Sequence, residues 1–219
     1  MNNPPRSVLV GLSLALGGPA FLAISFDDLV TGANGVAKSL MAQLVMWALL
    51  VAVVAITLKW EKRPLSSLGV RRFGGWSLFW GLIAAAALIY GVVPLATGLL
   101  AVTGLSGFEQ GLSEVLALPQ WLRVVAVATG GIVEEVLFRG YAITRLEALT
   151  GSQVFAAVFS VLVFALAHWP LWGTGPVLTF VLSGGFLAAW FLWRRDLVAN
   201  IVAHVVVDSM GLVFVPAGA

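Results

Sequence analysis

Long apolar stretches separated by short polar connections constrain the fold of this chain more than any other feature of its sequence. Hydrophobic residues make up 60% of its 219 residues and charged residues only 10%, whereas soluble globular domains carry about 25% charged residues. A helix that crosses a bilayer needs about 20 consecutive apolar residues, because the hydrocarbon core is about 30 Å thick. The pattern therefore predicts an all-α fold, a polytopic membrane helix bundle.

The apolar stretches predict about seven transmembrane helices. They cover residues 8–25, 39–58, 76–103, 121–149, 153–169, 174–193 and 197–215. Tryptophan is enriched where spans meet the membrane interface. The tryptophans at predicted span ends are Trp60, Trp76, Trp121, Trp169, Trp172 and Trp193. Residues 104–120 are predicted to lie at the interface or in a loop.

The first apolar stretch, residues 8–25, has the length of a secretory signal peptide. Only one cation, Arg6, precedes it, although a signal peptide begins with a positively charged region. The sequence Ile24-Ser25-Phe26 is also a poor cleavage site, because cleavage requires small residues. We therefore expect the first span to be retained.

Lys and Arg residues are divided unevenly between the two ends of the predicted bundle. One end receives Arg6, Lys59, Lys62, Arg63, Arg71, Arg72, Arg145, Arg194 and Arg195. The other end receives Lys38 and Arg123. Cytoplasmic loops of membrane proteins carry the excess of positive charge. We therefore predict an integral protein of the cell (inner) membrane with a cytoplasmic N-terminus.

Several functional classes are excluded by what the sequence lacks. The chain contains no cysteine, so disulfides, thiol catalysis and thiolate metal sites are ruled out. It has no glycine-rich phosphate loop, no dinucleotide-binding fingerprint and no basic stripe of the kind that binds nucleic acid. The expected partners are therefore the lipid bilayer and a membrane-associated molecule, and no nucleic acid.

The stretch from Gly130 to Arg145 places three charged residues, Glu134, Glu135 and Arg139, inside a predicted span. A charge in the middle of a membrane helix costs about 2.5–3.5 kcal/mol on insertion scales. Glu135 and Arg139 are four residues apart, so they share a helix face and can form an ion pair. Glu134 lies about 100° around the helix from Glu135. The pairing explains one carboxylate and leaves the other free.

Three glycines, Gly130, Gly131 and Gly140, flank these charges. A glycine exposes bare backbone, so another helix or a substrate can approach closely. We expect such an approach beside the two carboxylates.

The only two histidines of the chain, His168 and His204, also fall inside predicted spans. Asp208 follows His204 by four residues and shares its helix face. Counted from the predicted inner ends of their helices, Glu134 and His204 lie at similar depths of about 12–14 Å. Each of these residues alone has an ordinary structural explanation, but together they indicate a site in the inner half of the membrane.

Carboxylates combined with histidines can activate water, either as general bases or as metal ligands. The serines that remain as candidate nucleophiles, Ser160, Ser183 and Ser209, lie in no recognisable nucleophile turn. Hydrolysis of an amide is the natural reaction of such a set.

Three motifs follow one another along the chain. They are Glu134-Glu135-x-x-x-Arg139, Phe164-x-x-x-His168 and His204-x-x-x-Asp208. In this order and helix context the chain resembles the CPBP family, which comprises CAAX prenyl endopeptidases and bacteriocin-processing enzymes, also called Abi proteins. The resemblance covers residues 66–211 and includes the lead-in Ser67–Arg71. It implies variable N-terminal transmembrane helices over residues 1–65 and a catalytic helix bundle over residues 66–215.

The resemblance implies an intramembrane endopeptidase that acts on a membrane-associated peptide or protein. Glu134 would be the general base on the attacking water and His168 would assist it. His204 and Asp208 would stabilise the oxyanion. The residues Glu135, Arg139 and Phe164 would support the site. The scissile bond is expected to arrive laterally or from the inner face.

Position 208 departs from the pattern of the prenyl endopeptidases, which often have asparagine there. Asparagine donates a hydrogen bond to an oxyanion and an ionised aspartate cannot. Asp208 would therefore be protonated, orient His204 or bind a metal. A metal would be held by Glu134, His168, His204 and Asp208. No cofactor is favoured, because the chain has no H-E-x-x-H pair of the kind that binds zinc. Zinc is the alternative.

Two other classes of function compete with proteolysis. One is a non-enzymatic membrane immunity or scaffold protein that retains the motifs. The other is a transporter with a proton relay of Glu, His and Asp residues, although the chain has no inverted repeat of the kind many transporters show.

Overall fold

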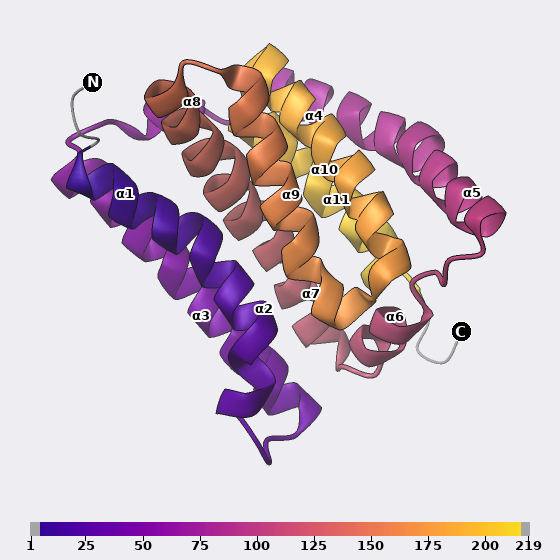
Figure 1. Cartoon of the computed structure of the whole chain (residues 1–219). Coiled ribbons are helices and arrows are strands. Elements are labelled where there is room, and N and C mark those ends of the chain that lie inside the picture. Colours follow the sequence, from indigo (N-terminus) through magenta and orange to yellow (C-terminus); the bar gives the residue numbers. More distant parts are fainter. Residues whose placement is uncertain (1–4, 216–219) are drawn as a thin grey trace.

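The computed structural model describes residues 5–215 and is an all-α bundle (Figure 1). Three long helices come first: α1–α2 (Arg6–Leu12, π-helical Ser13–Gly17 and Gly18–Leu29), α3 (Gly35–Ala55) with π-helical Ile56–Trp60, and α4–α5 (Gly75–Ala87, π-helical Leu88–Val92 and Val93–Thr103). The continuous helix α7–η5–α8 follows, made of Gln120–Ala128, Thr129–Ile143 and Thr144–Thr150. The last three helices are α9 (Gln153–Trp172), α10 (Thr174–Arg194) and α11 (Leu197–Leu212). Two short helices complete the bundle, the 3₁₀ helix Leu65–Leu68 and α6 (Glu109–Leu116). The predicted fold class is confirmed.

Within the described residues, five helices are long and apolar enough to cross a membrane. They are Arg6–Ser25, Gly35–Trp60, Gly75–Thr103, Gln153–Trp172 and Thr174–Arg194. The fourth predicted span is helical throughout but carries the charged motif in η5. The seventh is the shorter apolar helix Leu197–Leu212. The chain is an integral membrane protein in which the helix with the charged motif and the short apolar helix α11 accompany five long apolar helices.

Several helix ends differ from the predicted ones because local caps decide them. The first helix continues to Leu29, and α3 begins at Gly35, so the predicted connection 26–38 is largely helical. The side chain of Asn34 accepts a hydrogen bond of 2.9 Å from the backbone nitrogen of Ala37, which satisfies a donor that the first helical turn leaves open. Part of the predicted interfacial segment 104–120 folds as α6.

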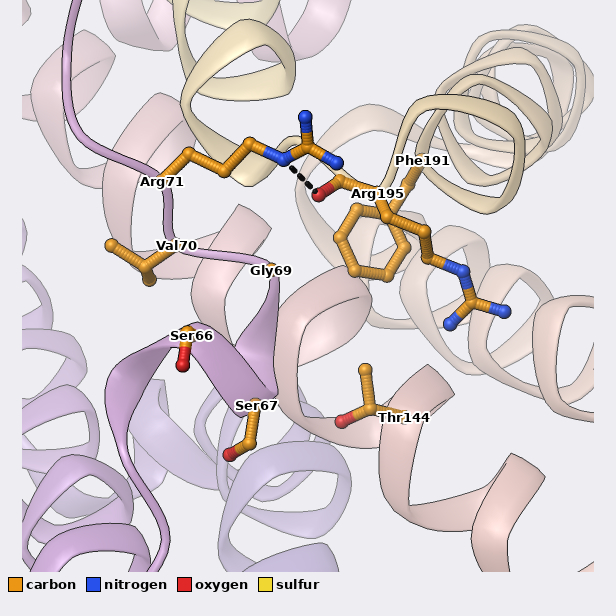
Figure 2. A pocket seen from close by; sticks show the side chains of 8 residues that line it. All are labelled: Ser66, Ser67, Gly69, Val70, Arg71, Thr144, Phe191 and Arg195. Atoms are coloured by element: carbon orange, nitrogen blue, oxygen red, sulfur yellow. Dashed lines mark hydrogen bonds between the residues drawn. The ribbon is translucent and has the colours of Figure 1, made fainter.

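One end of the bundle gathers the basic connections. Arg145 is buried and pairs with Glu61 at 2.8 Å, and Arg195 pairs with Glu147 at 2.8 Å. Figure 2 shows Arg71 beside a small pocket of about 280 Å³, with its Nε donating to the backbone oxygen of Arg195 at 3.0 Å. The helix α8 lies at this end, whereas α6 lies at the opposite end (Figure 1). We call the two ends the basic end and the α6 end.

The expected close approach at the glycines of η5 is confirmed. A Cβ built on Gly131 would lie 3.1 Å from the backbone nitrogen of Val205, so η5 and α11 pack backbone against backbone at this point. A Cβ on Gly140 would lie 3.2 Å from the backbone oxygen of Leu68. Small residues allow such contacts between membrane helices, where packing rather than the hydrophobic effect drives association.

Replacing Gly131 with alanine should destabilise the bundle. The added methyl group meets the backbone of Val205, which cannot move without shifting α11, and overpacking typically costs about 1–3 kcal/mol. We expect thermal unfolding in detergent at a lower temperature than for the wild type. Gly185→Ala is the matched control, because a Cβ there meets nothing within 4 Å and alanine favours the helix. Equal unfolding temperatures for the two variants would contradict the packing described.

Candidate active site

Glu134 and His168 face each other from η5 and α9. The Oε2 atom of Glu134 lies 3.8 Å from Nε2 of His168, and their side chains are 17% and 18% exposed. The Nδ1 atom of His168 lies 2.7 Å from the backbone oxygen of Phe164. A carbonyl oxygen only accepts, so Nδ1 carries the proton of a neutral ring and Nε2 is left with its lone pair. Glu134 and Nε2 are thus two acceptors on either side of a gap.

His204 is held between two carboxylates from different helices. Its Nδ1 lies 2.9 Å from Oε1 of Glu135, and its Nε2 lies 3.4 Å from Oδ2 of Asp208. Nδ1 is therefore the donor to Glu135. The predicted common face of His204 and Asp208 on α11 is confirmed by the second distance. The contact with Glu135 fixes the ring so that Nε2 points toward Asp208.

Glu135 has more partners than the sequence suggested. It pairs with Arg139 at 3.0 Å as predicted, yet the same carboxylate also accepts from His204 and, at 3.2 Å, from Nδ2 of Asn200. Its side chain is 0% exposed. The interpretation that Arg139 alone accounts for Glu135 was incomplete, because the partners on α11 come from a distant part of the chain. Asn200 was missed, although it precedes His204 by four residues and so shares its helix face.

Phe164 packs against both Arg139 and His168. The guanidinium of Arg139 lies over its ring at 4.4 Å from the centroid, and the ring of His168 lies 4.5 Å away. Arg139 also donates to the backbone oxygen of Gly184 at 3.3 Å. A cation over an aromatic face is attracted by the ring, so Phe164 holds Arg139 and His168 together. Phe180 on α10, whose ring lies 4.3 Å from His168, was not predicted.

The predicted reactive groups share one cavity of about 1410 Å³. Glu134, His168, His204 and Asp208 all belong to its wall, whereas Glu135 and Arg139 lie behind the wall and are 0% and 1% exposed. Bare backbone forms the wall next to Asp208, since a Cβ on Gly130 would lie 3.0 Å from Oδ2 of that residue. The sequence-predicted residues thus separate into a set that faces the cavity and a set that supports it.

The arrangement does not suit a metal ion. Within residues 5–215, no group of three or more His, Cys, Asp or Glu side chains is placed to hold one. Among the four predicted ligands, the contacts within 4 Å join Glu134 to His168 and His204 to Asp208.

The candidate nucleophilic serines are engaged elsewhere. The hydroxyl of Ser160 donates to the backbone oxygen of Phe138 at 2.8 Å. Those of Ser183 and Ser209 donate to carbonyls one turn back along their own helices, at 2.8 and 2.6 Å. None of these bonds links a serine to a histidine, so they form no nucleophile–base pair.

Removing the buried carboxylate should cost far more stability than removing a partly exposed one. Glu135→Ala leaves Arg139 as an unpaired buried charge and deprives His204 of its acceptor, a loss of about 3–5 kcal/mol. Glu147→Ala is the matched control, because Glu147 and Arg195 are 24% and 34% exposed and such surface pairs contribute about 0–1 kcal/mol. Thermal unfolding in detergent measures both. Undiminished stability of Glu135→Ala would show that the ion pair is not formed.

Comparison with known proteins bears on the segment that carries all these residues. No curated protein and no solved structure matches the chain. Residues 116–210 match the family described as Rce1-like type II CAAX prenyl endopeptidase. The matched segment contains the three motifs, from Glu134 to Asp208, and its reactive side chains line one cavity. Residues 116–210 are therefore a domain of the Rce1-like type II CAAX prenyl endopeptidase family, the CPBP family that the motifs resemble.

Proposed function

We propose that this chain is an intramembrane endopeptidase that hydrolyses a peptide bond in a membrane-associated protein or peptide. The observation that carries the proposal is the opposition of Glu134 and His168 across 3.8 Å at the wall of a large cavity. A water molecule in the cavity beside these two acceptors can donate one hydrogen bond to each. Membership of residues 116–210 in a protease family supports the same reaction.

Glu134 acts in this proposal as the general base. Its carboxylate takes one proton of the water while the water oxygen bonds to the carbonyl carbon of the substrate. The unprotonated Nε2 of His168 accepts the other water hydrogen in a hydrogen bond and so orients the attack. The tetrahedral intermediate collapses when the carbon–nitrogen bond breaks, and Glu134 returns its proton to the leaving nitrogen. The products are a carboxylic acid and an amine.

His204 stabilises the oxygen that becomes negative during the attack. Because Glu135 holds the Nδ1–H of the ring, the second nitrogen is directed at the cavity beside Asp208, and in its protonated form it donates to the oxyanion. Asp208 orients that nitrogen at 3.4 Å. Glu135 and Arg139 support the site from behind the cavity wall, and Phe164 supports it from within the wall.

The two predicted parts of the chain have different roles in the proposal. Residues 66–215 carry the reactive groups. Residues 1–65 supply one wall of the cavity through α2 and α3, with Pro19, Ser39 and Met46 among the lining residues. Variation in these first helices would then change which substrates fit without touching the chemistry.

A non-enzymatic immunity or scaffold protein is the competing function. Such a protein needs no general base at the wall of a cavity, and it would be expected to lose one of the motif residues. Glu134, His168 and His204 are all present, and all three face the cavity. This placement supports a hydrolase over a binding protein.

Glu134→Gln should abolish cleavage and leave the fold intact. The change is nearly isosteric, but an amide cannot take a proton from water, and a general base contributes about 10²–10⁴-fold to the rate. Cleavage is measured with a library of quenched fluorescent peptides on the purified protein in lipid nanodiscs. Glu109→Gln in α6, which is exposed and outside the cavity wall, is the matched control. A Glu134→Gln variant that cleaves at the wild-type rate would overturn the assignment of the base.

Asp208→Asn should keep most of the activity, and chelators should not remove it. Asparagine can still orient Nε2 of His204, and no step of the proposed reaction passes through a metal. If Asp208 instead belonged to a metal site, its loss would cost about 10–100-fold in affinity or activity. Two measurements decide between the metal-free role of Asp208 and a metal site. They are the rate of peptide cleavage with and without a chelator, and the zinc content of the purified protein. Stoichiometric zinc, with activity lost on chelation and restored by zinc, would contradict the metal-free mechanism.

A further inference from the structure

The two ends of the bundle differ sharply in charge. Most of the cations predicted at one end lie in or beside the connections 61–74 and 195–196 and helix α8. Interactions such as Glu61 with Arg145 and Arg71 with the backbone of Arg195 hold these segments together at the basic end. In the described part of the chain, the α6 end carries Lys38 and Arg123 as its only Lys or Arg residues.

The active-site cavity opens at the α6 end. Its exposed lining residues include Asn34, Gly35, Gln110, Glu114, Leu171 and Met210. The loop before α3, helix α6 and the ends of α9 and α11 supply them, all at the α6 end (Figure 1). The buried lining residues, such as Phe164 and Gly184, surround the reactive groups. The cavity therefore leads from the α6 end to Glu134.

The basic end is closed above the site. No residue of the connections 61–74, 151–152 and 195–196 belongs to the cavity wall. Side chains that are 0% exposed fill the space between the site and this end. They are Leu68, Tyr141, Ile143, Phe191 and Leu197. A scissile bond that arrived from the basic end would have to pass this packing.

We propose that the substrate enters from the outer face of the membrane, as an extended apolar segment of a translocated protein. The proposal rests on the function proposed above. Cytoplasmic ends of membrane proteins carry the excess of Lys and Arg, so the basic end faces the cytoplasm and the open α6 end faces outward. The terminus of a cytosolic protein that approached the inner surface would meet the closed basic end.

The depth of the site sets the form of the substrate. Glu134 lies fourteen residues along the helix from Gln120 at the α6 end, which corresponds to about 20 Å at 1.5 Å per residue. An extended chain spans this depth with about six residues. The volume of about 1410 Å³ also exceeds the roughly 300–1,000 Å³ of a small-molecule pocket. A peptide segment without helical structure is therefore the occupant that reaches the base.

Cysteine accessibility tests the direction of entry without depending on catalysis. The chain contains no cysteine, so single replacements report their own positions. Ser66→Cys marks the exposed basic end, Ser106→Cys marks the exposed α6 end, and Ser183→Cys marks the cavity wall near the site. The probe is a membrane-impermeant maleimide, applied to right-side-out and to inverted membrane vesicles.

We expect Ser106→Cys and Ser183→Cys to react in right-side-out vesicles, and Ser66→Cys to react in inverted vesicles alone. Reaction of Ser183→Cys in inverted vesicles alone would overturn the proposal, and so would an exchange of sides between Ser66→Cys and Ser106→Cys. Ala167→Cys, at the lining residue next to His168, replaces Ser183→Cys if that variant does not fold. If neither cavity variant reacts from the outer side, the proposed entry is wrong.

Failure of the proposed function is distinguishable from failure of this inference. The labelling pattern should be the same when Glu134→Gln is added to each variant, because access does not depend on the base. A chain that labels as expected but cleaves no peptide would refute the endopeptidase alone. A chain that cleaves peptides but labels Ser183→Cys only from the basic end would refute outer entry alone.

Discussion

A fully buried carboxylate, that of Glu135, holds together the helices that carry the site. It contacts Arg139 within η5 and reaches Asn200 and His204 on α11. Arg139 and Asn200 in turn donate to the backbone of α10, at Gly184 and at Leu187. An unpaired charge in hydrocarbon is costly, so these contacts must form together. They fix the mutual positions of three helices.

The neighbouring carboxylate, that of Glu134, belongs to the cavity wall, whereas Glu135 makes the buried contacts that join the helices. Successive residues of a helix point about 100° apart, so when Glu135 faces the supporting network, Glu134 faces the cavity. The ring of His168 is set by the backbone oxygen of Phe164 and by the rings on either side of it. Buried contacts therefore hold Glu134 and His168 in place at the cavity wall, with their two acceptor atoms 3.8 Å apart. The proposed activation of a water molecule requires two acceptors at such a defined separation.

The cavity reaches from this site to the α6 end of the bundle. Helices α2 and α3, outside the matched domain, supply part of its wall, so the shape of the cavity depends in part on residues that the family match does not cover. At the basic end, Arg145 pairs with Glu61 and Arg195 pairs with Glu147 where the loops are most positive. In the proposed entry from the α6 end, the substrate does not pass these contacts.

The sequence by itself determined the features that depend on local spacing and composition. The apolar stretches set the all-α membrane fold, and spacings of four residues placed Glu135 beside Arg139 and His204 beside Asp208. Only the tertiary structure decided how distant helices meet: the contacts of Glu135 with Asn200 and His204, the packing of Phe180 on His168, and the end at which the cavity opens. Hydrophobic periodicity tells which face of a helix is apolar. It does not tell which helix packs against that face, because many arrangements bury the same apolar surface, and backbone contacts such as that of Gly131 with Val205 select one of them.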